Sequence, residues 1–316
     1  MAVVEADKAA HGTAPSRSVT PRRPEPTRRP VTHLVPRRIR TIVRRTGGEL
    51  RSAVNKAALV GAVTGPSRPR MASLVASTLL APEARRPSAR SARPVRVPDH
   101  DGALYLRPRS RDVLALQFVF TEGHHLPPAE LDGPVERIAV FGANIGLPMA
   151  DLADRYPGAR LLGIEPDADN VRLARANLAG IADRASVVEA AVWHTAGTLS
   201  LGWETDAWGL SVSPAEEGDG VETVVEAVAA ADVVDGFADD GPIDYLLVNI
   251  EGGWYDLLAH DAGWARSVRC IKVEIQDRSD EAVALLEGLG FDTEIERLPW
   301  GAFVTGIRRP VAAQAA

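Results

Sequence analysis

The sequence is poor in cysteine and has no long apolar run. Its single cysteine, Cys270, excludes an intramolecular disulfide and a cysteine-based metal site. Cys270 lies in the run SVRCIKVEI, and we expect it to be a buried strand thiol. Because no stretch of about 18 apolar residues is present, we expect no membrane-spanning helix.

The beginning of the chain lacks the apolar segment that a secretory signal carries. The pairs Arg22-Arg23 and Arg28-Arg29 are not followed by a hydrophobic stretch, so we do not expect a twin-arginine signal. We therefore expect a cytoplasmic protein.

Charge is distributed unevenly along the chain. Residues 1–110 hold 22 of the 36 Lys+Arg and 7 of the 42 Asp+Glu, so this part carries +15 and the remainder −21. Such an asymmetry indicates two physically different parts. Nearly all the basic residues are arginines, which together with abundant alanine is typical of a GC-rich bacterial gene.

The basic part divides into two segments. Residues 1–30 are rich in Pro, Arg, Thr and Ser and are expected to be a disordered tail. Residues 31–95 are expected to form short amphipathic helices and a linker, and a compact domain is expected over 96–316. Apolar residues recur at helical spacing in two sets: Ile39, Ile42 and Val43, and Met71, Leu74, Val75 and Leu79.

Three roles are open for the basic segment. The first is an arm that binds nucleic acid, and the second is a helix on a membrane surface. The third is a segment that packs on the acidic part of its own chain or of a partner chain. No aromatic residues are interleaved with its arginines, so nucleic acid is the less favoured partner. Packing is favoured, and a homo-oligomer through this segment stays open.

From about residue 111, expected strands and helices alternate. The expected strands are 138–143, 159–165, 186–192, 243–250 and 267–275, the expected helices are 148–156, 169–179 and 280–290, and a hairpin is expected over 291–298 and 302–309 around the turn Pro299-Trp300-Gly301. This alternation predicts an α/β fold with a doubly wound, mostly parallel sheet.

A glycine-containing turn, Gly142-Ala143-Asn144-Ile145-Gly146, follows the first of these strands. Glycines there let the backbone approach a ligand, and the next helix offers free N–H groups. The pattern is GxxxG rather than GxGxxG, so NAD is not favoured. A pair of glycines required only for packing is an equally good explanation.

An acidic residue follows at the end of the next strand, where Glu165 lies in GIEPDADN. A carboxylate at this place can accept both hydroxyl protons of a ribose. Asp167 is the expected N-cap of the following helix. The alternative is that Glu165 is a solvated residue at a strand end.

The segments FGANIGLPMADLADRYPGARLLGIEPDADN and LLVNIEGGWYDLL resemble the FkbM-type family of SAM-dependent methyltransferases. In that family they commonly read VDVGANIG, IEP and KIDIEGAE. The similarity covers about residues 111–307. It implies the class I methyltransferase fold, a Rossmann-like, seven-stranded, mostly parallel sheet with a C-terminal antiparallel hairpin. It also implies S-adenosyl-L-methionine (SAM) as cofactor and methylation, usually at oxygen, of a small-molecule or sugar-like acceptor.

The chain departs from this family pattern at four positions. The Asp of VDVG falls on Val140, the Lys and Asp of KIDIEG fall on Leu247 and Asn249, and the last acid of EGAE falls on Trp254. Losing an acid beside the methionine amino group would remove a charge-assisted hydrogen bond. A divergent member with non-methylating chemistry or a non-catalytic role is therefore the alternative function.

The site is expected at the carboxyl ends of the strands, where this fold binds its ligands. The resemblance implies SAM binding by Gly142, Ala143, Asn144, Gly146, Glu165, Glu189 and Asn249. The expected catalytic bases are Glu251, His194 and Glu274, and the expected substrate-binding residues are His124, His125, Trp208 and Trp254. No histidine spacing indicates a metal site.

Overall fold

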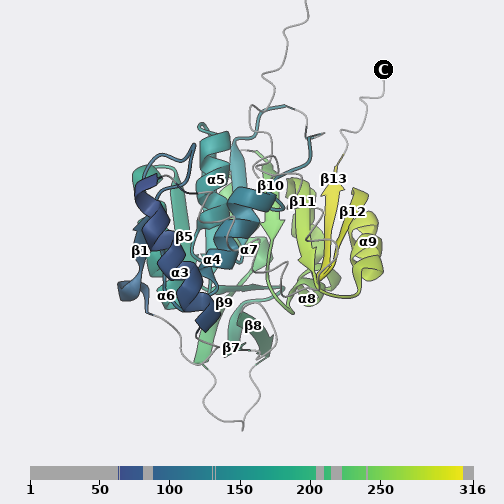
Figure 1. Cartoon of the computed structure of the whole chain (residues 1–316). Coiled ribbons are helices and arrows are strands. Elements are labelled where there is room, and N and C mark those ends of the chain that lie inside the picture. Colours follow the sequence, from purple (N-terminus) through teal and green to yellow (C-terminus); the bar gives the residue numbers. More distant parts are fainter. Residues whose placement is uncertain are drawn as a thin grey trace, which may run out of the picture.

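A seven-stranded sheet forms the centre of the protein (Figure 1). The computed structural model describes residues 63, 65–80, 88–129, 131, 133–203, 210–214, 223–239 and 241–308. The strand order is β12-β13-β11-β10-β3-β4-β5, and β13 is antiparallel to both of its neighbours. The strands are β3 (Arg137–Phe141), β4 (Arg160–Glu165), β5 (Ala185–Glu189), β10 (Ile243–Val248), β11 (Val268–Ile275), β12 (Asp292–Leu298) and β13 (Gly301–Ile307). The predicted fold class is confirmed.

Helices cover both faces of this sheet. One face carries α3 (Arg68–Leu80), α4 (Asp112–Gln117), α5 (Leu147–Arg155) and α6 (Ala168–Asn177), and the other carries α7 (Ala230–Ala238), α8 (Trp254–Ala259) and α9 (Ser279–Gly288). Successive strand residues point to opposite faces, so Val140 joins the first core while Ala139 and Phe141 join the second. Burial on both sides explains why the strands are continuous apolar runs in the sequence.

Short helical turns connect several of these elements. They are η2 (Gly65–Ser67), η3 (Ala89–Ser91), the π-helical η4 (Phe118–Glu122), η5 (Ala179–Ile181) and η6 (Ala262–Ser267). Cys270 is a fully buried strand thiol, as predicted, and burial raises its pKa to about 12. Among the described residues, no helix has both the length and the apolar character needed to cross a membrane.

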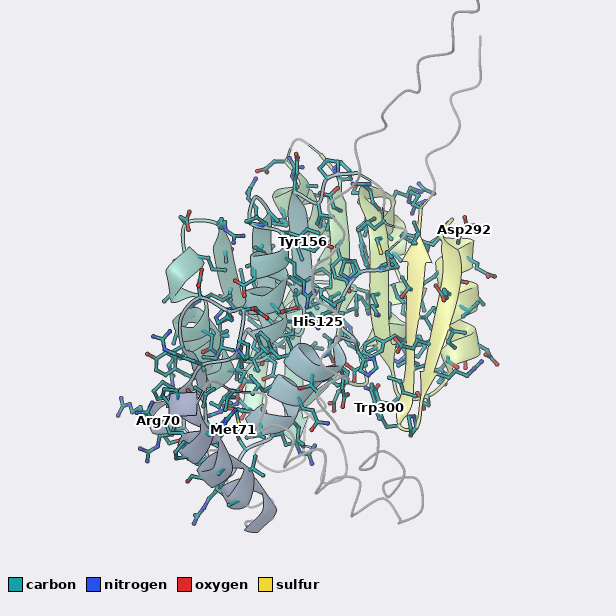
Figure 2. All side chains as sticks on the ribbon, turned by 45° about the horizontal axis from the view of Figure 1, so that its top comes forward. Arg70, Met71, His125, Tyr156, Asp292 and Trp300 are labelled. Carbon is teal, nitrogen blue, oxygen red and sulfur yellow. The ribbon has the colours of Figure 1, made fainter. Side chains whose placement is uncertain are left out.

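The amphipathic helix expected around Met71 is present as α3 and packs on the first core. Met71 and Leu74 are buried there together with Leu104 of the two-stranded sheet β1 (Arg93–Val95) and β2 (Leu104–Leu106). Figure 2 shows Arg70 pointing away from the molecule and Met71 pointing into it. We therefore propose that the domain includes α3 and begins no later than Val63, rather than at residue 96. The expected tail over 1–30 and the helix expected around Ile39 lie outside the described residues.

A second, four-stranded sheet was not predicted. It has the order β6-β9-β7-β8, with β6 (Ala191–Trp193), β7 (Gly197–Trp203), β8 (Leu210–Pro214) and β9 (Thr223–Ala229). The prediction of one strand over 186–192 was wrong, because the chain leaves the main sheet at Ala190, whose N–H donates to the Glu165 carbonyl over 3.1 Å. The second sheet lies beyond the carboxyl ends of the main parallel strands (Figure 1). It therefore borders the edge at which this fold binds ligands.

Candidate functional site

Four neighbouring strands bring the predicted polar residues to one edge of the sheet. Gly142 follows β3, Glu165 ends β4, Asn249 follows β10, and Glu274 lies one residue before the end of β11. These strands are consecutive in the order β11-β10-β3-β4. With neighbouring strands about 4.8 Å apart, the four residues form one continuous rim.

The two glycines of the turn after β3 have left-handed backbone conformations. Gly142 has φ +82°, and a Cβ added there would lie 1.9 Å from the Asn249 carbonyl oxygen. Gly146 has φ +79°, and a Cβ there would lie 3.0 Å from the Cα of Ala174 in α6. Packing against β10 and α6 therefore accounts for both glycines.

The N–H groups of the turn itself are engaged within the protein, whereas the expected free N–H groups were those of the following helix, α5. The N–H groups of Gly142 and Ala143 donate to the Ile164 carbonyl (2.9 Å each), that of Asn144 to Glu165 Oε2 (2.8 Å), that of Ile145 to Asn144 Oδ1 (2.8 Å) and that of Gly146 to the Ala143 carbonyl (2.9 Å). The glycine loop, residues 142–146, is thus held by hydrogen bonds to β4 and by two hydrogen bonds within the loop. Asn144, at φ +50°, is its exposed residue.

The Glu165 side chain is hydrogen-bonded to the glycine loop. Its carboxylate accepts hydrogen bonds from the N–H of Asn144, the N–H of Asp167 (3.0 Å) and the side-chain amide of Asn170 (3.1 Å). The residue is only 4% exposed, and burial raises the pKa of Glu165 to about 7. Asp167 caps α6 as predicted, accepting from the Asn170 N–H over 2.9 Å. Glu165 therefore joins the glycine loop to the first turn of α6.

A buried ion pair that the sequence did not reveal extends this network. Arg107 donates to both carboxylate oxygens of Asp112 over 2.8 and 2.9 Å, and to the Asn170 side chain over 2.8 Å. Both charged residues are buried. The contacts connect Asp112, Arg107, Asn170 and Glu165 in series, so the segment before α4 supports the glycine loop. No sequence motif indicates this network, because Arg107 and Asn170 are 63 residues apart in the chain.

Two of the three expected bases lie close together. Glu251 follows β10 and Glu274 belongs to β11, its neighbour in the sheet. Burial raises the pKa of Glu274 to about 7, and the negative charge of Glu251 adds to this effect. Within the described ranges, the side chain of Glu274 makes no hydrogen bond or ion pair. A carboxylate of this pair could accept a proton or bind a cation.

His124 lies near this acid pair. Its ring contacts Glu122 Oε2 at 3.4 Å and Glu296 Oε1 at 3.2 Å, and it stacks on Phe303 with 5.7 Å between ring centroids. Burial lowers the pKa of His124, but the bond to Glu122 and the charge of Glu296 outweigh it, so the pKa is raised. His124 is the expected substrate-binding residue that the structure brings to the acid pair.

Two other expected substrate-binding residues lie in the interior. His125 lies inside the molecule (Figure 2) and is 1% exposed. Its Nε2 lies 3.0 Å from Asp151 Oδ2, and its carbonyl accepts from the Tyr245 hydroxyl over 2.7 Å. Trp254 is 2% exposed and packs in the second core. Neither side chain reaches the rim as folded here. Trp208 lies outside the described residues.

The remaining predicted residues differ in position and exposure. His194 follows β6, with its ring 5.1 Å from that of His260. Glu189 is exposed at the end of β5, paired in register with Glu165. Ala143 is fully buried, and Asn249 is half-buried. Across the part of the chain that the structure describes, no group of three or more His, Cys, Asp or Glu is arranged to hold a metal ion.

Comparison with known proteins points to one family. Residues 141–293 match the family model described as the methyltransferase FkbM domain. No curated protein matches the chain.

Solved structures similar to this chain include three bacterial proteins. Precorrin-6y C5,15-methyltransferase from Geobacter metallireducens is 13% identical, covers 60% of this chain and 89% of its own, and has a TM-score of 0.38. A methyltransferase from Geobacter sulfurreducens is 16% identical, covers 55% and 71%, and has a TM-score of 0.34. An O-methyltransferase family protein from Burkholderia thailandensis is 10% identical, covers 63% and 60%, and has a TM-score of 0.40. Residues 141–293 thus form a methyltransferase FkbM domain, in agreement with the resemblance of the sequence motifs.

Proposed function

We propose that this protein transfers a methyl group from SAM to a hydroxyl oxygen of a small-molecule acceptor. The observation that carries the proposal is the arrangement at the carboxyl edge of the FkbM domain. The glycine loop follows β3, and the acid pair Glu251 and Glu274 lies on the next two strands. A methyl donor over the loop and an acceptor over the acids would therefore be neighbours.

The accessible groups of the rim fit SAM by their chemistry. SAM carries a sulfonium, an ammonium, a carboxylate and two ribose hydroxyls. The rim presents the amides of Asn144 and Asn249 and the carboxylates of Glu189 and Glu251, which are exposed or half-buried. Carboxylates attract the two cations and accept from hydroxyls, and amides serve both kinds of partner. Glu165, which is engaged with three protein donors, acts in this proposal by holding the loop.

Glu251 is the proposed general base. SAM supplies a methyl group on a good leaving group, and the transfer needs little beyond alignment and removal of one proton. As the acceptor oxygen bonds to the methyl carbon, the carbon–sulfur bond breaks and Glu251 takes the hydroxyl proton. Glu251 suits this role because it follows β10, the strand between β3, which leads to the glycine loop, and β11, which carries Glu274.

The test is formation of S-adenosylhomocysteine (SAH) from SAM with a panel of hydroxyl-bearing acceptors. We expect Glu251→Gln to keep SAM affinity and to lower kcat by about 10²- to 10⁴-fold, the usual contribution of general base catalysis. Glu136→Gln is the matched control, since Glu136 is exposed at the amino end of β3. Unchanged kcat in Glu251→Gln would remove Glu251 from the mechanism.

A second candidate is a protein that keeps the fold without ordinary methyl transfer. Three positions that are charged in the family pattern favour this candidate. Here they are occupied by Val140, Leu247 and Trp254, which are buried in the cores. These side chains cannot replace the lost charges at the rim. SAM binding without SAH formation on any acceptor of the panel would favour this candidate.

A further inference from the structure

An aromatic cluster lies at the end of the β12–β13 hairpin, beside the acid pair. It consists of Phe118, His124, Trp300 and Phe303. The Trp300 ring lies 5.5 Å from that of Phe118 and 5.9 Å from that of Phe303, measured between centroids. Trp300 is 36% exposed, and Figure 2 shows it at the hairpin end. The cluster therefore presents an aromatic surface to solvent next to the rim.

The strand register places Glu274 on the same face as this cluster. Glu274 of β11 is paired with Phe303 of β13, and Phe303 is paired with Glu296 of β12. Paired residues of neighbouring antiparallel strands point to the same face, with their Cβ atoms about 5 Å apart. Three adjacent strands thus form a row of acid, aromatic ring and acid.

The two acids of this row differ in their partners. Glu296 contacts His124 at 3.2 Å and lies 4.0 Å from Lys272 Nζ, so Lys272 and the protonated form of His124 compensate its charge. Lys272 is further held by the Leu126 carbonyl, over 3.1 Å. Within the described residues the half-buried Glu274 side chain makes no ion pair, and the charge of His124 acts on it from beyond ion-pair distance. A half-buried carboxylate with no cation in direct contact is unfavourable, and a ligand cation would relieve that cost.

We infer that the acceptor carries an aliphatic ammonium group, bound between the Glu274 carboxylate and the aromatic face of Trp300. An ammonium near an aromatic face is attracted by the ring quadrupole, and its N–H groups form charge-assisted hydrogen bonds to a carboxylate. The inference rests on the proposed function, because it assigns this surface to the methyl acceptor. Arylalkylamines and amino sugars with a free hydroxyl are the classes that fit.

Three probes that share a phenol ring and differ in charge test this inference. They are tyramine, 4-ethylphenol and 4-hydroxyphenylacetate, which are cationic, neutral and anionic at pH 8. Their dissociation constants are measured on the full chain without SAM, by calorimetry or ligand-detected NMR. We expect tyramine to bind at least tenfold more tightly than 4-ethylphenol, and 4-hydroxyphenylacetate to bind most weakly. Equal affinities, or no binding of tyramine, would overturn the inference.

Two variants locate the binding. Glu274→Gln keeps the shape and removes the charge, so it should weaken tyramine about tenfold and leave 4-ethylphenol unchanged. Trp300→Ala should weaken both. The matched controls are Tyr105→Ala, which removes a similarly exposed ring (37%) on β2, and Glu136→Gln. An unchanged tyramine affinity in folded Glu274→Gln would contradict the assignment.

Failure of this inference can be told from failure of the proposed function. SAM binding with no preference among the probes removes the ammonium site and leaves methyl transfer in place. A preference for tyramine that depends on Glu274, in a protein that does not bind SAM, supports the ammonium site and removes methyl transfer.

Discussion

At the scale of single residues, two buried glutamates have the same raised pKa for different reasons. Burial dominates in both, but Glu165 is surrounded by three protein donors, whereas Glu274 faces another acid. Glu165 is therefore tied to the stability of the fold, and Glu274 is available to a ligand. Titration of Glu165 should therefore change the stability of the protein, and titration of Glu274 should change acceptor binding.

Glu165 should make the protein less stable as pH rises from 4.5 to about 7. The folded state holds the Glu165 proton up to about pH 7, whereas the unfolded state releases it near 4.5. The folded state thus binds more protons within this window, and its free energy of unfolding falls with rising pH, by about 3 kcal/mol in total. Denaturant unfolding between pH 4.5 and 8 should show this slope in the wild type and a flatter one in Glu165→Gln. Parallel curves for the two proteins would contradict the assignment.

Glu274 should make acceptor binding dependent on pH. If the acceptor is an ammonium compound, it prefers ionised Glu274, whose fraction rises about tenfold between pH 6 and 8 for a pKa of about 7. KM should fall by about that factor over this range, with Glu251 and His124 as the other titrating groups that face Glu274. The dependence should be lost in Glu274→Gln; a KM independent of pH in the wild type would speak against the site.

At the scale of elements, the pair Arg107–Asp112 joins the N-terminal segment to the glycine loop. Arg107→Met leaves Asp112 buried without a cation, and we expect a loss of about 3–5 kcal/mol in the free energy of unfolding. The matched control is Arg172→Met, which breaks the exposed pair with Asp169 and should cost no more than about 1 kcal/mol. Similar losses in both variants, measured by denaturant unfolding, would show that the buried pair has no special role.

Helix α3 should be needed for stability. Its Met71 and Leu74 are buried in the first core, so removal of residues 1–95 exposes core surface, whereas removal of residues 1–62 leaves α3 in place. Met71→Ala should cost about 2–5 kcal/mol, the usual range for emptying a buried methionine site. Ser73→Ala, on the exposed side of α3, is the control. Full stability of a chain that starts at residue 96 would show that α3 does not contribute.

The main sheet could be predicted from the sequence and the second sheet could not. Strands buried on both faces are apolar runs, and β3, β4, β10 and β11 were found in this way. The pairing of β6 with β9 joins segments more than 30 residues apart in the chain, and no local pattern encodes it. The break at Ala190 follows from the same distant pairing, because β6 begins at Ala191, which pairs with Ala227 of β9.

The sequence predicted the location of the candidate site at the edge of the sheet, but not the contacts of its side chains. The motifs located the glycine loop, Glu165 and Glu251 at one edge. Whether a side chain faces the rim depends on neighbours distant in the sequence. His124 and His125 are adjacent, yet one stacks on Phe303 and the other pairs with buried Asp151.

At the scale of the whole molecule, the proposed binding regions follow one another along the carboxyl edge of the main sheet, in the order of its strands. The loop and Glu165 lie over β3 and β4, the proposed base follows β10, and the ammonium site lies over β11 and β13. Residues 111–316 carry a formal charge of −21, which favours the approach of cationic ligands. The account as a whole thus predicts a cationic donor beside a cationic acceptor.

The most direct test of the central claim is calorimetric titration of the full chain with SAM and with SAH. The account predicts one site per chain with micromolar affinity for both, and weaker binding in Glu165→Ala because the glycine loop loses its support. Absence of binding by a protein that unfolds cooperatively would contradict SAM-dependent methyl transfer and favour the non-methylating alternative.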